Sequence, residues 1–462
     1  MCPNSIGSPL INYYRCPSNC GQTVSPSFCE GESTYFRYGN DITGYGRCET
    51  PLVVKSPAGA LHDVSKEVSI EAGKVHLPFD PIEVINNLYL ERYIKDWLQG
   101  RPSSGISEMY YWVRPLLPVS VRRYLQQIYL RDWERIPFPC WPVDTSVNNL
   151  LEQLFLLSIR ASGMVEIPFI WFWPLGLQAC AIMTHDVETT LGRDFCQTLM
   201  DMDDSYGVRA SFQVVPEERY LVDEKFLSQI RDRGFEVVVH DLNHDGRLYK
   251  SRAQFLERVA KINTYGKNYK SKGFRAGVLY REQLWYDALE FEYDMSVPNV
   301  AHLDPQRGGC CTVMPYFIGD ILELPVTTTQ DYTLFNVLND YSTNLWEQQI
   351  EIIIRKHGLM SFIIHPDYIR KTRERKVFDS LLGRLADLRE RERVWITTPG
   401  EVNRWWRQRA QMSLVEDGDG WRIEGEGEER AVVAYARERN GKLAVSFEKS
   451  CESGKSECVD TI

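Results

Sequence analysis

The stretch EVVVHDLNHDGRLY, residues 236–249, places two histidines four residues apart after an apolar run that is typical of a buried strand. On one extended strand His240 and His244 would lie about 13 Å apart, too far for both to bind one metal ion. A helical turn after His240 would instead bring residues i and i+4 together on one face. The chain has only eight histidines. The pair taken alone fits two metal ligands where a strand meets a turn, and equally two solvent-facing histidines in a turn; carboxylates at another strand end would favour the metal.

Carboxylates follow an earlier apolar run, in MTHDVETT, where Asp186 and Glu188 stand two residues apart. Two histidines and one carboxylate leave a coordination position open for water, which is the pattern of catalytic zinc sites. Either acid can supply the third ligand, and the other can then act as the general base. The metal would lower the pKa of the water, and the base would remove a proton as the water attacks a carbonyl group.

Two further polar side chains stand at the ends of later apolar runs, Arg275 in GFRAG and His365 in FIIHPDYI. Arg275 can hold the base ionised through its opposite charge. His365 can donate a proton to the leaving group. Together these residue types predict metal-assisted hydrolysis of an acyl derivative.

The candidate residues belong to an alternation of short apolar runs with helix-like segments. The runs that read as strands are ACAIMTHD, RASFQVV, FEVVVHD, GFRAG, YDMSV, ILELPV, MSFIIHP and RVWITT. Strands that alternate with helices predict parallel pairing, and chemistry in such folds gathers at the carboxyl ends of the strands. Seven or eight strands favour an α/β fold of the barrel type.

The residues before and after this segment do not show the alternation of strand-like and helix-like patterns. A Cys-, Gly- and Pro-rich start predicts irregular structure, several helical stripes follow it, and Asn440-Gly441 is a hairpin signal near the other end. We therefore expect an irregular segment at 1–60, a mainly helical extension at 61–175, the barrel at 176–405, a small β module at 406–450 and a polar tail at 451–462.

The barrel segment, roughly half of the chain, resembles the polysaccharide deacetylase family, also called carbohydrate esterase family four or the NodB homology domain. The His-x3-His motif of that family is met by His240 and His244, and its strand that ends in histidine by His365. Its Thr-Phe-Asp-Asp motif corresponds to residues 184–188, THDVE, with altered spacing. Its Arg-x-Pro-x-Gly motif is met only by Arg275, without the proline.

The resemblance implies a distorted (β/α)7 barrel and removal of an N-acetyl group from an amino sugar or a glycan precursor. It implies Asp186 as the base and Glu188 as the third metal ligand, with the reverse assignment open. It also implies His365 as the acid, oriented by Asp331, which begins an echo of the family's Asp-x-x-x-Trp motif; Asp367 is a local alternative. The metal would be a divalent ion, zinc first, with cobalt, manganese or iron as alternatives.

Composition limits the remaining possibilities. The net charge of −10 argues against a protein that binds the phosphate backbone of nucleic acids. No apolar stretch is long enough to span a bilayer, and the start of the chain lacks a secretory pattern, so we expect a cytoplasmic location. The altered motifs leave two alternatives: hydrolysis of another linear or cyclic amide, and a non-catalytic binding protein on the same barrel.

Overall fold

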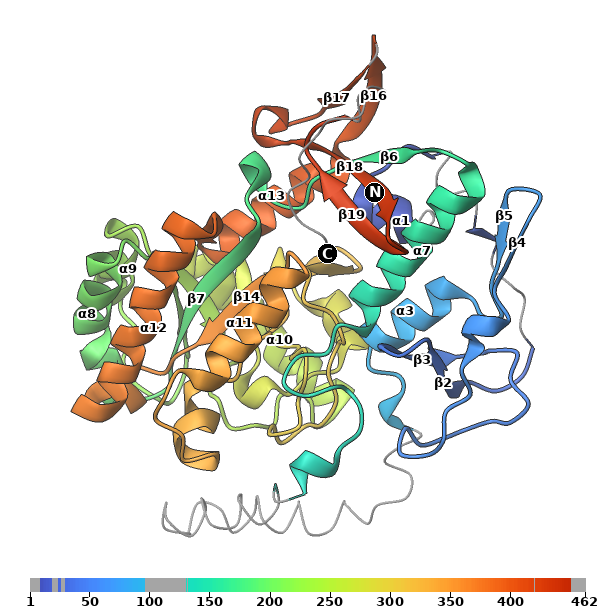
Figure 1. Ribbon diagram of the computed structural model, residues 1–462. Helices are drawn as coiled ribbons and strands as arrows, with labels where there is room; N and C mark the ends of the chain where they lie inside the picture. The colour runs from blue at the N-terminus through green and yellow to red at the C-terminus, as the bar shows by residue number, and fades with distance from the viewer. Residues whose placement is uncertain are drawn as a thin grey trace.

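A computed structural model of the chain describes residues 9–18, 24–25, 30–95, 130, 132–418 and 420–449. Its largest part is a parallel sheet that curls into a distorted barrel, with helices packed on its outside (Figure 1). The barrel strands are β7 (Ala179–Val187), β8 (Ser211–Val214), β9 (Glu236–His240), β10 (Gly273–Arg275), β11 (Tyr293–Asp294), β12 (Tyr316–Ile318), β13 (Ile321–Glu323), β14 (Leu359–Ile363) and β15 (Val394–Thr397).

Each apolar run that reads as a strand forms one, and neighbouring strands pair in parallel. The exception is β12, which the sequence did not predict and which pairs antiparallel with β13. β7 is the central strand and is buried along its whole length. One edge of β7 pairs with β14. Along the other edge, the first half of β7 pairs with β15 and the second half pairs with β8. The α/β barrel class predicted from the sequence is therefore confirmed.

Side chains complete the barrel between β13 and β14, where the described residues form no backbone ladder. The hydroxyl of Thr327 donates to the carbonyl of Leu359 at 2.7 Å and accepts from the amide of Ser361 at 2.9 Å. The hydroxyl of Thr328 donates to the carbonyl of Ser361 at 2.8 Å. Threonine hydroxyls therefore take the place of strand-to-strand hydrogen bonds at this seam.

The helices that cover the barrel bury one apolar stripe each, as the periodicity of the sequence predicts. They are α8 (Thr190–Ser205), α9 (Glu224–Asp232), α10 (Arg252–Tyr269), α11 (Asn344–Arg355), α12 (Thr372–Arg391) and α13 (Pro399–Gln411). Residues of β7 alternate between two cores: Ala181 and Met183 face the helices, whereas Cys180 and Ile182 join the inner core. Successive side chains of a strand point to opposite faces, so alternate residues of β7 pack into the two cores.

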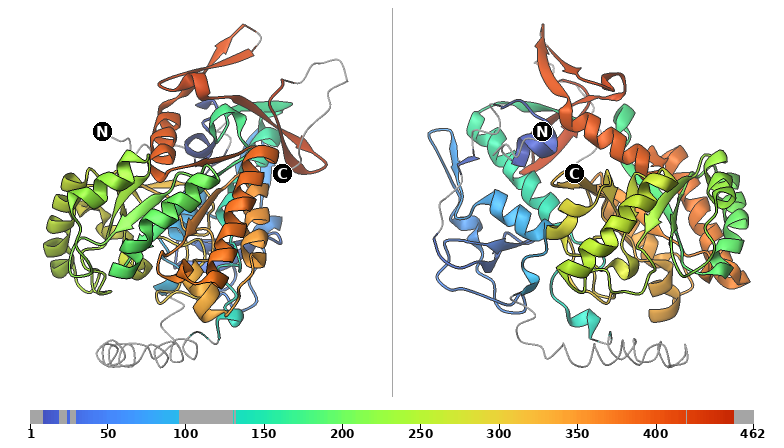
Figure 2. Two further views of the ribbon diagram at one scale, coloured as in Figure 1. Left: turned by 90° about the vertical axis from the view of Figure 1, so that its left-hand side faces the viewer. Right: turned by 180° about the vertical axis from the view of Figure 1, so that it is seen from behind.

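The residues before the barrel fold against its side (Figures 1 and 2). Their elements are α1 (Pro9–Tyr14), β1 (Val24–Ser25), β2 (Thr34–Tyr38), β3 (Ile42–Gly46), β4 (Ser69–Glu71), β5 (Lys74–His76), α3 (Pro81–Tyr89), α7 (Ser146–Ser162) and β6 (Glu166–Ile170). The hairpin β2–β3 lies in the segment expected to be irregular. Tyr35 and Phe36 are buried in it, so aromatic packing orders a stretch without clear periodicity. A helix expected at 121–130 and the tail at 451–462 lie outside the described residues, apart from Leu130.

The C-terminal strands form two hairpins, β16 (Ser413–Asp417) with β17 (Gly420–Glu424) and β18 (Val433–Arg439) with β19 (Lys442–Ser446). Asn440 and Gly441 have φ values of 53° and 78°, as the expected two-residue turn requires. β18 also pairs antiparallel with β6, which precedes the barrel in sequence. The β module therefore includes a strand from the N-terminal side of the barrel. Within the described part of the chain, no helix is long and apolar enough to cross a membrane.

Candidate active site

The carboxyl ends of four barrel strands bring the chemically distinctive side chains together. β7 carries Asp186, β9 ends at His240, β10 ends at Arg275, and His365 lies two residues after the end of β14. The parallel register places Arg275 beside His240. Contacts of 3.9 Å or less link all seven residues that the sequence singled out, namely Asp186, Glu188, His240, His244, Arg275, Asp331 and His365.

Three of these residues form a group that could hold a metal ion. Glu188, His240 and His244 each offer one ligand atom, and these atoms lie within 4.8 Å of one another. Oε1 of Glu188 is 2.9 Å from Nε2 of His244 and 3.9 Å from Nε2 of His240. Both Nε2 atoms are buried and neither has a hydrogen bond of good geometry to any described residue. Two buried imidazole nitrogens that lack a well-aligned hydrogen bond and face one carboxylate fit a divalent ion in a catalytic type of site.

The turn after β9 aims both histidines at this group. It is not the right-handed helical turn that the spacing suggested, because Asp241 and His244 have φ values of 57° and 55°. The amide of Asp241 donates to the carbonyl of Arg275 at 2.8 Å. Nδ1 of His240 lies 3.1 Å from the same carbonyl, which can only accept. Nδ1 therefore carries the proton, and Nε2 keeps a free lone pair for a metal.

Asp186 is held by an arginine rather than by the histidines. Nη1 of Arg275 donates to its Oδ1 at 2.6 Å and to the hydroxyl of Thr184 at 2.8 Å, and Nε donates to the carbonyl of Met295. Burial alone would raise the pKa of Asp186, but the charge and hydrogen bond of Arg275, together with the charges of His240 and His365, outweigh the burial, and the pKa is lowered. The other oxygen, Oδ2, is 3.7 Å from Nε2 of His240. Asp186 thus presents an ionised carboxylate beside the candidate metal position.

His365 is fixed by Asp331 from a distant loop. Nδ1 of His365 lies 2.6 Å from Oδ1 of Asp331, and the backbone amide of His365 donates to Oδ2 at 2.8 Å. Burial lowers the pKa of His365, but the carboxylates of Asp331 and Glu188 together more than compensate, so the pKa lies well above 6.5. Nε2 faces Oε1 of Glu188 at 3.5 Å. Asp367, the alternative partner, instead accepts a hydrogen bond from Thr189 at 2.5 Å.

Replacing Asp331 with asparagine is expected to move the alkaline limb of the activity profile to lower pH. A protonated His365 can donate a proton, and its raised pKa keeps that form present above pH 6.5 until the pH passes the pKa of the folded protein. Removing the carboxylate lowers that pKa. The measurement is kcat against pH for both proteins. An unshifted alkaline limb in the variant would contradict the pairing of Asp331 with His365.

Gly277, which follows Arg275 one position earlier than the glycine of the Arg-x-Pro-x-Gly motif, contributes to the geometry of the site. A Cβ atom there would lie 2.5 Å from Oδ2 of Asp241 and 3.0 Å from Cδ2 of His244. The two residues that follow, Val278 and Leu279, have φ values of 62° and 53°. The β10 loop therefore passes directly against the histidine turn, and only a residue without a side chain allows this approach.

The substitution Gly277→Ala is expected to weaken metal binding by about 10- to 100-fold, the usual effect of disturbing groups that orient a ligand. The reason is displacement of the ring of His244. Metal titration followed by calorimetry measures it. Gly383→Ala is the matched control, since only Tyr206 lies within 4 Å of its added Cβ, at 3.8 Å, on the helix α12. Equal metal affinity in both variants would show that Gly277 does not support the site.

A contributor that sequence reasoning missed is Arg219, in the loop after β8. Its Nε donates to the carbonyl of Asn243 at 3.0 Å, and its Nη2 donates to the carbonyl of His244. These bonds hold the turn of the histidine pair from outside the barrel. Nothing in the local pattern around Arg219 indicates this role, because the contact joins the loops that follow two different strands.

No protein-family model matches the sequence, and no curated protein matches it. Among solved structures, a polysaccharide deacetylase from Mycobacterium smegmatis matches at 15% identity and a TM-score of 0.42, over 52% of this chain and 93% of its own. An allantoinase matches at 12% identity and a TM-score of 0.38, over 51% and 92%. A mutant of a CE4 family pseudoenzyme with restored enzymatic activity matches at 14% identity and a TM-score of 0.32, over 48% and 67%. The family that the sequence motifs resemble is therefore represented among the solved structures similar to this chain.

Proposed function

We propose that this chain is a metal-dependent hydrolase that removes an N-acetyl group from an amino sugar or a glycan precursor. The observation that carries the proposal is the convergence of the buried Nε2 atoms of His240 and His244, neither with a well-aligned hydrogen bond, on the carboxylate of Glu188. On either side of this group stand an ionised carboxylate, Asp186, and a protonated imidazole, His365. The resemblance of the motifs to polysaccharide deacetylases supports an acetamide as the substrate.

Glu188, His240 and His244 would hold the ion, and the geometry favours Glu188 over Asp186 as the carboxylate ligand. Oδ1 of Asp186 is engaged by Arg275, whereas Oε1 of Glu188 points toward the histidines. A bound divalent ion supplies Lewis-acid chemistry that polarises a carbonyl group and makes water a better nucleophile.

Asp186 and His365 then divide the proton transfers. The carboxylate of Asp186 accepts a proton from the attacking water, and Arg275 keeps that carboxylate ionised beforehand. Nε2–H of His365 donates a proton to the amide nitrogen that leaves, because Nδ1–H is already bound to Asp331. The products are acetate and a free amine. Two groups with pKa values moved in opposite directions are the arrangement that base and acid roles require.

The test is release of acetate from a panel of acetamido sugars by the full chain loaded with zinc or cobalt. We expect about one divalent ion per chain by elemental analysis, together with acetate release. His244→Ala should lose both the ion and the activity. A panel of cyclic and non-sugar amides runs in parallel. Turnover of those amides alone would replace the deacetylase proposal, and an absence of metal after reconstitution would overturn the hydrolase mechanism.

A further inference from the structure

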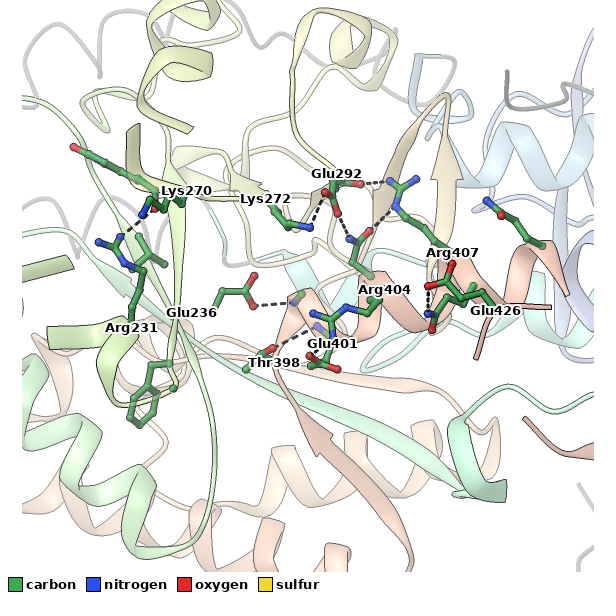
Figure 3. A pocket seen from close by; sticks show the side chains of 18 residues that line it. Arg231, Glu236, Lys270, Lys272, Glu292, Thr398, Glu401, Arg404, Arg407 and Glu426 are labelled. Carbon is green, nitrogen blue, oxygen red and sulfur yellow. Dashed lines mark hydrogen bonds and ion pairs between the residues drawn. The ribbon is translucent and has the colours of Figure 1, made fainter. Parts of the chain in front are cut away.

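A second pocket lies at the opposite ends of the barrel strands. It has a volume of about 460 Å³, within the usual range for small-molecule sites, and its walls come from the starts of β9 and β10 and from α13 (Figure 3). β9 begins in this pocket with Glu236 and ends in the candidate active site with His240. The pocket is therefore separate from the site at the carboxyl ends.

Five cationic side chains line this pocket, beside four acidic ones. The cationic side chains are Arg231, Lys270, Lys272, Arg404 and Arg407. Three of them form ion pairs with carboxylates, namely Arg231–Glu224, Lys272–Glu292 and Arg404–Glu401. The other two, Lys270 and Arg407, have no carboxylate oxygen within 4.0 Å in the described part of the chain. Their positive charges are unmatched in a protein whose net charge is −10.

Arg407 is held in place by neutral acceptors. Its Nε donates to Oδ1 of Asn403 at 2.8 Å, and its Nη2 donates to the carbonyls of Glu292 and Asp320. These bonds fix the guanidinium at the pocket wall without neutralising it. Lys270 is exposed at the end of α10, and Figure 3 shows it on the other side of the pocket from Arg407.

Four acids line the pocket, namely Glu236, Glu292, Glu401 and Glu426, and the carboxylate of Glu236 is bound by donors of the protein. Glu236 accepts hydrogen bonds from the hydroxyl of Tyr293 at 2.5 Å and from the amide of Gly400 at 2.8 Å. Burial raises the pKa of its carboxyl. Its two oxygens are thus committed to the protein. The amide of Gln408 donates to the carboxylate of Glu426 at 2.9 Å. Gln411 also lines the pocket, and its amide can bond a neutral polar group.

We propose that this pocket binds a small organic anion that carries one negative group at each end and a polar middle, the chemistry of a sugar bisphosphate. One anionic group would face Lys270 and the other would face Arg407. Since the pocket and the active site lie at opposite ends of the barrel, this ligand is distinct from the substrate that is hydrolysed.

The test is calorimetric titration of the full chain with fructose 1,6-bisphosphate, and with glucose 6-phosphate as the probe with one anionic group. We expect the bisphosphate to bind at least about tenfold more tightly than the monophosphate. Lys270→Gln should reduce its affinity by about tenfold or more. Lys267→Gln is the matched control on the same helix, because Lys267 pairs with Glu290 and does not line the pocket.

Three results would overturn the proposal: no binding of the bisphosphate to the wild type, equal affinity for the two probes, or equal losses in the two lysine variants. Lys270 is exposed, so its replacement leaves the fold intact. Arg407→Lys provides a second variant, which retains the charge but not the paired bonds to the two carbonyls. We expect it to bind the bisphosphate better than Arg407→Ala does, and the reverse order would also contradict the assigned role.

Discussion

Replacing Asp186 with asparagine is expected to lower kcat for acetate release by about 10²- to 10⁴-fold, the contribution typical of a general base. Asparagine cannot accept the proton of the attacking water. Glu188, His240 and His244 are untouched, so the metal content should stay at the value of the wild type. The measurement pairs steady-state kinetics with elemental analysis on the same preparation.

Asp367→Asn is the control for this experiment. Asp367 is a carboxylate close to the same strand ends, but it accepts a hydrogen bond from the hydroxyl of Thr189 rather than from a group of the site. The kcat of the Asp367→Asn variant should stay within about twofold of that of the wild type, because Asp367 does not take part in proton transfer. A metal-loaded Asp186→Asn protein with unchanged kcat would remove Asp186 from the role of base.

Removing the carboxylate of Glu91 is expected to lower the free energy of unfolding by about 3–5 kcal/mol, the cost of leaving a buried charge without its partner. Glu91 follows α3 and accepts hydrogen bonds from both Nε and Nη2 of Arg281, and from the amide of Gly309 at 2.6 Å. Both side chains of the pair are buried. Chemical denaturation of Glu91→Ala beside the wild type measures the loss.

Two further variants separate this ion pair from a general effect of substitution. The double variant Glu91→Ala/Arg281→Met removes both charges and should recover part of the lost stability. Glu438→Ala breaks the exposed pair with Arg160 and should cost no more than about 1 kcal/mol. If Glu91→Ala lowers the free energy of unfolding no more than Glu438→Ala does, the buried ion pair does not stabilise the fold as expected.

This ion pair also links the N-terminal part of the chain to the active-site loops. Arg281 donates through Nη1 to the carbonyl of Leu279 at 3.0 Å, and Leu279 belongs to the loop whose Gly277 packs against His244. Residues before the barrel therefore stabilise a loop that contacts a candidate metal ligand. The sequence reasoning left the role of these residues open.

The elements of the barrel and the position of the site were accessible from the sequence because both depend on local patterns. Apolar runs of strand length alternate with amphipathic segments, and all the runs form strands. The polar residues that end these runs must meet at one edge when the strands pair in parallel. This rule alone brings His240, Arg275 and His365 into one group. The assignment of Asp331 needed the family resemblance, since no local pattern joins a loop residue to a histidine 34 positions away.

Other features were decided only by contacts between distant segments. The choice between Asp186 and Glu188 depends on Arg275, which engages one acid and leaves the other toward the histidines. The pairing of β6 with β18 and the ion pair of Glu91 with Arg281 join residues far apart in the chain. Such contacts depend on how whole elements pack, and side-chain spacing within one segment carries no information about them. The sequence determined which residues stand at the strand ends, and the tertiary structure decided which of them bind one another.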